Sequence, residues 1–266
     1  MMKELSRRAQ LHRKVDEELT DPQVERVHDY VDALTREIVE WVLPDSWLVS
    51  ESWREEFRSR LQAHHAVNIA PLSKTTFEDA FSFACASSGN TVTRSASATN
   101  RFWDVQVGDV RLSLKTTAAK NLNPKFVHIS KLTEAAWIQD QRSASGRREK
   151  TIELIRNFRE NVDAIIILRA FRHASESVRR YELIEIPGAL LDAVYNTPKA
   201  AFDADGPRVP LPFGETEPDL VLKLDRSDSK ITLTLIRIKS CVVHAVWDFS
   251  DPSVVSRSMK VDAPRL

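Results

Sequence analysis

A near-continuous apolar run in the middle of the chain limits what the chain can fold into. The run follows Asp163 and reads Ala164-Ile165-Ile166-Ile167-Leu168. Successive side chains of a strand point to opposite sides of a sheet, so a strand that is apolar at every position is buried on both faces. The run therefore predicts a central sheet with a layer of structure packed on each side.

The segments around this strand supply such layers. Apolar residues at helical spacing predict helices over 75–88 and 149–161 and a short helix over 187–196. Runs rich in β-branched and aromatic residues predict strands over 102–107, 110–115, 178–186, 219–225, 231–239 and 241–249. Residues 197–218 hold five of the twelve prolines and predict a loop. The expected fold class is α/β or α+β, a mixed central sheet flanked by helices.

The first 66 residues predict a helical N-terminal region. Asp21-Pro22 favours a helix start, because proline suits the first helical position. An apolar stripe then runs to Pro44 through Val24, Val27, Val31, Leu34, Ile38 and Trp41. A second short helix is predicted over 53–61. We divide the chain into this region (1–66), a core (67–250) and a C-terminal tail (251–266).

Composition excludes several classes of protein. None of the six glycines is spaced for a dinucleotide-binding motif or a P-loop. Cys85 and Cys241 lie far apart, which fits a reducing cytoplasm better than a disulfide or a zinc site. The N-terminal residues contain no apolar signal-peptide core, and no apolar run is long enough to cross a bilayer. We therefore expect a cytoplasmic protein without a membrane segment.

Positive charge is concentrated in one segment of a chain whose 38 basic and 38 acidic residues cancel. Residues 94–150 carry 11 basic and 5 acidic residues, a net charge of +6, whereas residues 1–60 carry 10 and 14, a net charge of −4. The neutral total alone argues against a general nucleic-acid binder. Local charge determines the field that a polyanion meets, so the central segment is a candidate surface for phosphate groups.

A predicted hairpin brings three polar side chains to one face of a strand pair. With Gly108-Asp109 as the turn, Asp104 lies opposite Ser113, and directly opposed residues project to the same side. Lys115 follows Ser113 by two residues and shares that side. This layout resembles that of the PD-(D/E)xK nucleases, in which hard carboxylate ligands suit Mg²⁺ and a lysine orients water or stabilises charge.

The second carboxylate of that pattern is missing, because its position is held by Ser113. Glu78, on the preceding predicted helix, could supply it. The other interpretation is a capping box, in which Thr75 and Glu78 bond the backbone at the start of the helix.

Six segments of the chain carry a wider resemblance: LSKTTFEDAF (72–81), Asp104-Val105, LKTTAAKN (114–121), VHISK (127–131), LIEIP (183–187) and CVVHAVWDF (241–249). Together they resemble one family, the SmaI-type II restriction endonucleases. The similarity runs in order over roughly residues 64–250. It implies a restriction-endonuclease-like fold for residues 67–250, which would be the PD-(D/E)xK catalytic core. The helical N-terminal region (1–66) could then serve in dimerisation or DNA contact.

The resemblance also implies an activity. Such enzymes are Mg²⁺-dependent homodimers that cut both strands of double-stranded DNA, with CCCGGG as the expected palindrome and 5′-phosphate ends. Asp104 and Lys115 would take the Asp and Lys of the motif, and Asp104 and Glu78 would hold the metal. A cognate methyltransferase is expected in the same system, without a stable complex.

Contacts with DNA are expected from the basic central segment, because arginine and lysine pair with phosphates and with guanine. The candidates are Arg94, Arg101, Lys120, Lys125, Arg142, Arg147 and Arg148. Lys120 could equally be a solvated surface lysine. The stretch 142–148 is either a mobile loop that orders on DNA or a solvated linker.

Two other functions fit the same residues. A different nuclease of the same core, such as a repair nickase or a junction resolvase, would cut one strand only or branched DNA only. A sequence-specific DNA-binding module with a decayed site, for which Ser113 would be the sign, would bind without cutting. The complete set of Glu78, Asp104 and Lys115 argues against decay.

Overall fold

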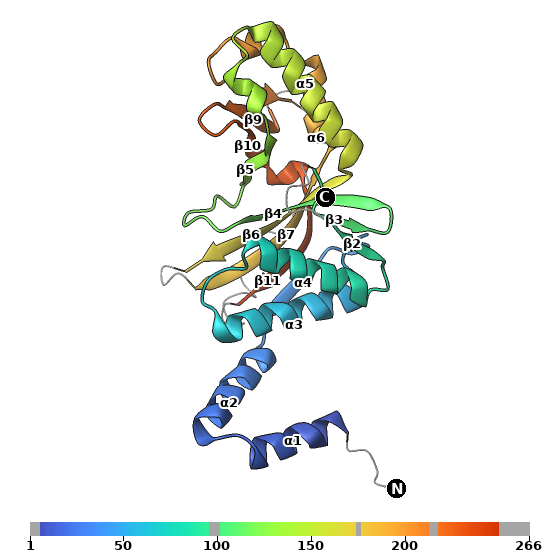
Figure 1. The fold of residues 1–266 in the computed structure, drawn as a ribbon, viewed down its shortest axis with the longest axis vertical. Coiled ribbons are helices and arrows are strands. Elements are labelled where there is room, and N and C mark those ends of the chain that lie inside the picture. Colours follow the sequence, from blue (N-terminus) through green and yellow to red (C-terminus); the bar gives the residue numbers. More distant parts are fainter. Residues whose placement is uncertain (1–5, 96–101, 174–176, 213–217, 250–266) are drawn as a thin grey trace.

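The apolar run forms part of strand β6 (Ala164–Arg172), which lies inside a seven-stranded sheet. The computed structural model describes residues 6–95, 102–173, 177–212 and 218–249 (Figure 1). β6 pairs in parallel with β4 (Val110–Thr117) and antiparallel with β7 (Val178–Pro187). The full strand order is β1 (Val39–Val42), β11 (Val242–Asp248), β7, β6, β4, β3 (Val105–Val107) and β2 (Val92–Arg94). The sheet is thus mixed, as predicted.

Both faces of β6 are buried, as its apolar sequence requires. Ile166 and Leu168 face one hydrophobic core, whereas Ile165 and Ile167 face a second core on the opposite side. Helices α3 (Glu51–Val67) and α4 (Lys74–Ser87) cover the first face (Figure 1). The second face is covered by α5 (Ala144–Asn161), by α6 (Ala189–Asp192) and by a separate sheet.

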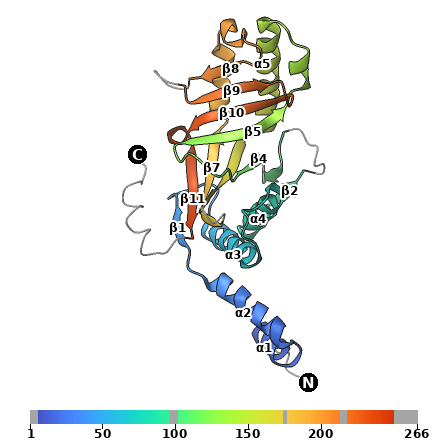
Figure 2. The same cartoon turned by 90° about the vertical axis from the view of Figure 1, so that its left-hand side faces the viewer.

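This separate sheet was not anticipated, because the sequence predicts one sheet only. It is antiparallel and contains β5 (Phe126–Glu134), β10 (Lys230–Arg237), β9 (Leu220–Asp225) and β8 (Arg208–Leu211), in that order. Figure 2 shows its strands running across those of the main sheet. β8 lies within the predicted loop 197–218, and it pairs with β9 despite Pro210 because it is an edge strand. The 3₁₀ turns are η1 (Ala136–Gln139), η2 (Ala193–Asn196), η3 (Lys199–Phe202) and η4 (Ile238–Ser240).

The N-terminal region is only partly helical, so the expectation of one helix continuing to Pro44 was wrong. Helices α1 (Arg7–Glu17) and α2 (Asp21–Thr35) extend away from the body (Figures 1 and 2). The chain then becomes extended and forms β1, where Trp41 lies opposite Val246 of β11. Pairing with β11 overrides the helical spacing of Ile38 and Trp41. β1 and α3 therefore belong to the layered body although they precede residue 67.

Two further features bear on the expected organisation of the chain. The predicted tail, 251–266, lies outside the described residues. Within the described part of the chain, no helix combines the length and the apolar composition that a bilayer crossing requires.

Candidate active site

The predicted hairpin forms, with the predicted register. Gly108, in the turn, has φ +57°, a left-handed conformation that glycine adopts without steric cost. Val105 lies opposite Leu112, and Val107 lies opposite Val110. The regular pairing ends at Val105, and the N–H of Asp104 donates to the carbonyl oxygen of Leu112 at 2.9 Å. The side chains of Asp104 and Ser113 still meet as predicted, at 3.3 Å from Ser113 Oγ to Asp104 Oδ2. The regular strand is shorter than predicted, because β3 begins only at Val105.

Asp104 is held in place at one of its two carboxylate oxygens. The backbone N–H of Leu114 donates to Asp104 Oδ2 at 2.7 Å, and the hydroxyl of Ser113 donates to the same atom. The other oxygen, Oδ1, accepts a hydrogen bond from Lys74 Nζ at 2.8 Å. Only 17% of the Asp104 side chain is exposed. Two hydrogen bonds from strand β4, donated by Leu114 N–H and the Ser113 hydroxyl, therefore fix the orientation of the Asp104 carboxylate.

Lys115 lies on the same side of the hairpin, as its spacing predicts. Its Nζ donates to Ser113 Oγ at 2.7 Å and lies 3.8 Å from Asp104 Oδ2. Burial lowers the pKa of Lys115 below its ordinary value, although the negative charge of Asp104 acts in the opposite direction. Ser113 thus connects the lysine to the aspartate instead of providing a third carboxylate.

Glu78, on helix α4, lies close to Asp104 and Lys115, and we call these three residues the carboxylate cluster. The helix begins after Ser73, whose side chain caps it by accepting from the backbone N–H of Thr76 at 3.2 Å. Glu78 therefore does not close a capping box, and that interpretation was wrong. Its carboxylate lies 3.3 Å from Lys74 Nζ and 3.4 Å from Arg94 Nη2. The buried side chains on either side, Phe77 and Ala80, anchor this turn of the helix in the core.

The site contains a residue that was not singled out from the sequence. Lys74 bridges the two carboxylates, through Oδ1 of Asp104 and Oε1 of Glu78. Burial alone would lower the pKa of Lys74, but the hydrogen bond and charge of Asp104, followed by those of Glu78, raise it. The sequence did contain a signal for the contact with Glu78. Lys74 precedes Glu78 by four residues and so shares its face of the helix.

The donor set fits a hard divalent cation that keeps much of its water. Asp104 and Glu78 contribute two carboxylates that converge on one point, the ammonium of Lys74. Among the residues that the structure describes, no group of three or more His, Cys, Asp and Glu side chains could hold a metal. Mg²⁺ is commonly bound through one or two carboxylates together with substrate phosphates. Two convergent carboxylates therefore suit Mg²⁺ better than a metal that needs a full protein cage.

The candidates for DNA contact fall into different environments. Arg94, on β2, forms ion pairs with Asp79 and with Glu78, next to the carboxylate cluster. Lys120 and Lys125 are exposed on the connection between β4 and β5, directly after the strand of Lys115. Arg101 lies outside the described residues.

The stretch 142–148 is not a mobile loop or a linker, and both interpretations were wrong. Helix α5 begins at Ala144, capped by the hydroxyl of Ser143. The buried guanidinium of Arg147 donates to the carbonyl oxygens of Phe202 at 2.8 Å and Asp203 at 2.9 Å.

Its neighbour Arg148 donates to the carbonyl oxygens of Thr197 at 2.8 Å and Tyr195 at 3.0 Å. Both arginines therefore stabilise the fold instead of presenting a free charge to DNA. Arg142 remains exposed.

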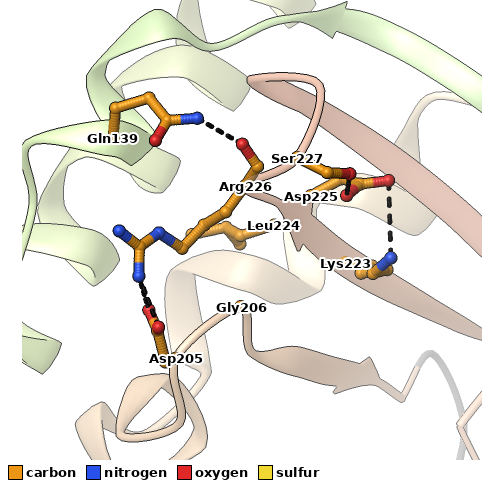
Figure 3. A pocket seen from close by; sticks show the side chains of 8 residues that line it. All are labelled: Gln139, Asp205, Gly206, Lys223, Leu224, Asp225, Arg226 and Ser227. Atoms are coloured by element: carbon orange, nitrogen blue, oxygen red, sulfur yellow. Dashed lines mark hydrogen bonds and ion pairs between the residues drawn. The ribbon is translucent and has the colours of Figure 1, made fainter.

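A pocket of about 500 Å³ lies elsewhere, at the turn between β9 and β10 (Figure 3). Its polar side chains bond one another, as in the ion pair of Arg226 with Asp205 and that of Lys223 with Asp225 at 3.4 Å. Glu78, Asp104 and Lys115 do not line it. This pocket is therefore separate from the cluster of candidate catalytic residues.

Comparison with known proteins agrees with this geometry. Residues 15–249 match the SmaI family model, described as type II site-specific deoxyribonuclease. Type II restriction enzyme SmaI from Serratia marcescens is 30% identical over 215 residues, which cover 77% of this chain and 83% of that enzyme.

A solved structure titled "Restriction endonuclease in complex with substrate DNA" aligns over 95% of this chain and 98% of its own, at 11% identity and a TM-score of 0.36. That likeness is too low to support an argument. The family match spans both strands of the catalytic hairpin and helix α4, so it includes every residue of the carboxylate cluster. The chain therefore belongs to the SmaI family of type II site-specific deoxyribonucleases, and it is a DNA-cleaving hydrolase of the restriction endonuclease type.

Proposed function

We propose that this enzyme cuts both strands of double-stranded DNA at a GC-rich palindrome, with CCCGGG as the expected site, and leaves 5′-phosphate ends. The observation that carries the proposal is the cluster of Asp104, Glu78 and Lys115. Both carboxylates contact the ammonium of Lys74, and Lys115 Nζ lies 3.8 Å from Asp104 Oδ2. The similarity to SmaI supports it. We further propose Mg²⁺ as the cofactor, because the two carboxylates suit a hydrated hard cation.

Each residue of the cluster has a distinct part in this proposal. Asp104 and Glu78 hold the cation, and the hydrogen bonds from Leu114 and Ser113 keep the aspartate correctly turned. Once bound, the cation would neutralise charge on the phosphate and acidify a water molecule. Lys115 donates a hydrogen bond to the attacking water or to a phosphate oxygen on which negative charge develops. Its low exposure strengthens that interaction, because charges attract more strongly in a poorly solvated site.

We assign DNA binding to exposed basic residues, of which Arg94 lies next to Glu78 in this cluster. Arg94, Lys120, Lys125 and Arg142 remain candidates for phosphate or base contacts. A palindromic site has two-fold symmetry, so we propose a homodimer that places one cluster on each strand. The spacing of the two clusters would determine whether the ends are blunt or staggered.

The proposal is tested by digestion of a plasmid with the purified enzyme, in Mg²⁺ or in EDTA, followed by sequencing of the ends. We expect discrete, Mg²⁺-dependent fragments that end within CCCGGG. Cleavage of one strand only would instead indicate a nickase. A gel shift on a CCCGGG duplex without any cleavage would indicate a binding module.

The Asp104→Asn variant should abolish cleavage and still shift the CCCGGG duplex, because it removes a metal ligand but leaves the DNA-contacting surface. We expect a loss of cleavage of at least about 100-fold, the size typical for a residue that stabilises charge in the transition state. A variant that cleaves at the wild-type rate would remove Asp104 from the site.

A further inference from the structure

Lys74 occupies the point toward which the two catalytic carboxylates are turned. Its Nζ lies 2.8 Å from Asp104 Oδ1 and 3.3 Å from Glu78 Oε1. The remaining oxygen of each carboxylate is held by the scaffold. Asp104 Oδ2 accepts from Leu114 N–H, and Glu78 Oε2 lies 3.4 Å from Arg94 Nη2. The ammonium thus takes the two oxygens that are not held by the scaffold.

The placement of this lysine is not explained by the helix dipole or by packing. Lys74 is the first residue of α4, where the positive end of the helix dipole disfavours a cation. Its side chain is 53% exposed, so it is not fixed by packing. The two carboxylates are what draw the ammonium to this point, because each would otherwise repel the other.

We propose that Lys74 is a built-in counterion that competes with the divalent cation for Asp104 and Glu78 and gives way when the cation binds. This inference rests on the proposed metal-dependent function. Two positive charges cannot share the same pair of oxygens, so cation binding must first break both ion pairs of Lys74. The affinity of the free enzyme for the cation is reduced accordingly.

A consequence follows for the order of binding. The ammonium needs a new partner once it leaves the carboxylates, and a DNA phosphate beside the site would provide one. DNA would then help the cation to bind, and by linkage the cation would help DNA to bind to the same degree. Lys74 would in this way discourage metal loading in the absence of substrate.

The test is calorimetric titration of Ca²⁺ into the full chain without DNA, so that no turnover enters the measurement. We expect Lys74→Met to bind Ca²⁺ about five- to ten-fold more tightly than the wild type, the size of two modest ion pairs that no longer have to be broken. Methionine is a good helix former and retains the length of the side chain.

Lys150→Met is the matched control. Lys150 lies on α5 with 45% of its side chain exposed and pairs with Glu153 at 2.7 Å, so its loss changes the net charge equally. The control should leave the Ca²⁺ affinity unchanged. Equal affinities for wild type and Lys74→Met, or equal tightening in both variants, would overturn the inference. So would an absence of Ca²⁺ binding in both the wild type and Lys74→Met.

A second measurement separates this inference from the proposed function. Adding a CCCGGG duplex, shown by gel to stay intact in Ca²⁺, should tighten Ca²⁺ binding more in the wild type than in Lys74→Met. If the wild-type enzyme cleaves DNA while the duplex tightens Ca²⁺ binding equally in the wild type and in Lys74→Met, then Lys74 does not couple Ca²⁺ binding to DNA binding. The nuclease function stands in that case. If wild-type enzyme does not cleave DNA at all, the proposed function fails.

Discussion

Ser113 stands where the nuclease pattern that the hairpin resembles would have an acidic residue, and its contacts give it a different task. The side chain is fully buried, accepts from Lys115 Nζ at 2.7 Å and donates to Asp104 Oδ2 at 3.3 Å. A carboxylate here would have to fit a space filled by a hydroxyl. The serine therefore orders the lysine and the aspartate relative to each other, which is not the behaviour of a decayed site.

Ser113→Ala should consequently impair catalysis without removing the metal ligands. Lys115 would lose its nearest acceptor in a poorly solvated place, which costs about 1–3 kcal/mol. We expect cleavage to fall by about ten-fold or more, while Ca²⁺ affinity measured by calorimetry changes much less than in Asp104→Asn. Unchanged cleavage would show that Lys115 needs no such support.

Individual site residues were predictable where strand geometry alone decides which side chains meet. A two-residue turn and the alternation of a strand place Asp104, Ser113 and Lys115 together, and the structure agrees. Lys74 was missed because its role depends on contact between a helix and a hairpin that are distant in sequence. Arg147 was assigned to DNA for the same reason, since its burial depends on a loop 55 residues away.

At the scale of elements, a polar network ties the connection between β1 and α3 to the sheet. His244 lies at a bulge of β11, where the register with β7 shifts between Val243 and Ala245. Its ring contacts Ser46 Oγ at 2.8 Å on one side and Glu185 Oε2 at 3.0 Å on the other. Trp47 Nε1 donates to the same glutamate oxygen at 2.7 Å.

This network predicts a pH dependence of stability. Burial would raise the pKa of Glu185, but the hydrogen bonds from His244 and Trp47 outweigh it and lower the pKa below the ordinary 4.5. A depressed pKa of an acid stabilises the fold above its unfolded-state pKa, and this contribution disappears as the pH falls through the folded-state pKa. Glu185→Gln should destabilise by about 1–2 kcal/mol at pH 7.

The difference in unfolding free energy between wild type and Glu185→Gln should shrink once the pH drops below 4.5. Urea unfolding at a series of pH values from neutral downwards measures it. A difference that stays constant to low pH would mean that Glu185 is not ionised in the folded protein.

Helices and strands could be predicted where their own sequence pattern is strong. They could not be predicted where pairing with another strand determines the structure. β6 and β11 are mostly apolar, β7 mixes apolar with charged residues, and all three strands lie where expected. β1 and β8 are edge strands of four residues each, with no strong strand pattern of their own, and they form because β11 and β9 offer partners.

At the scale of the whole molecule, the N-terminal pair of helices projects from the layered body, to which α2 is joined next to α3 (Figure 1). Neither α1 nor α2 has a buried residue, yet Tyr30 and Val31 expose apolar surface on α2. From the sequence, α1 carries a net charge of +2 and α2 a net charge of −3, counted as four basic and two acidic residues against one and four. Such complementary helices suit packing against the same pair of a second copy.

If a homodimer forms through these helices, Val31→Asp should dissociate it. The aspartate would place a charge in an apolar contact, and burying an unpaired charge costs several kcal/mol. We expect light scattering coupled to size exclusion to give a dimer for the wild type and a monomer for Val31→Asp, with unchanged helical content. Both clusters would then no longer reach the two strands together, so the variant should nick plasmid DNA instead of linearising it.

Val67→Asp is the control, because Val67 is 72% exposed at the end of α3, within the layered body, compared with 47% for Val31. It should remain a dimer and cut both strands. A Val31→Asp variant that stays dimeric but binds the CCCGGG duplex more weakly would show that these helices contact DNA instead of a second subunit. A dimeric variant with unchanged DNA binding would place the dimer interface on the layered body.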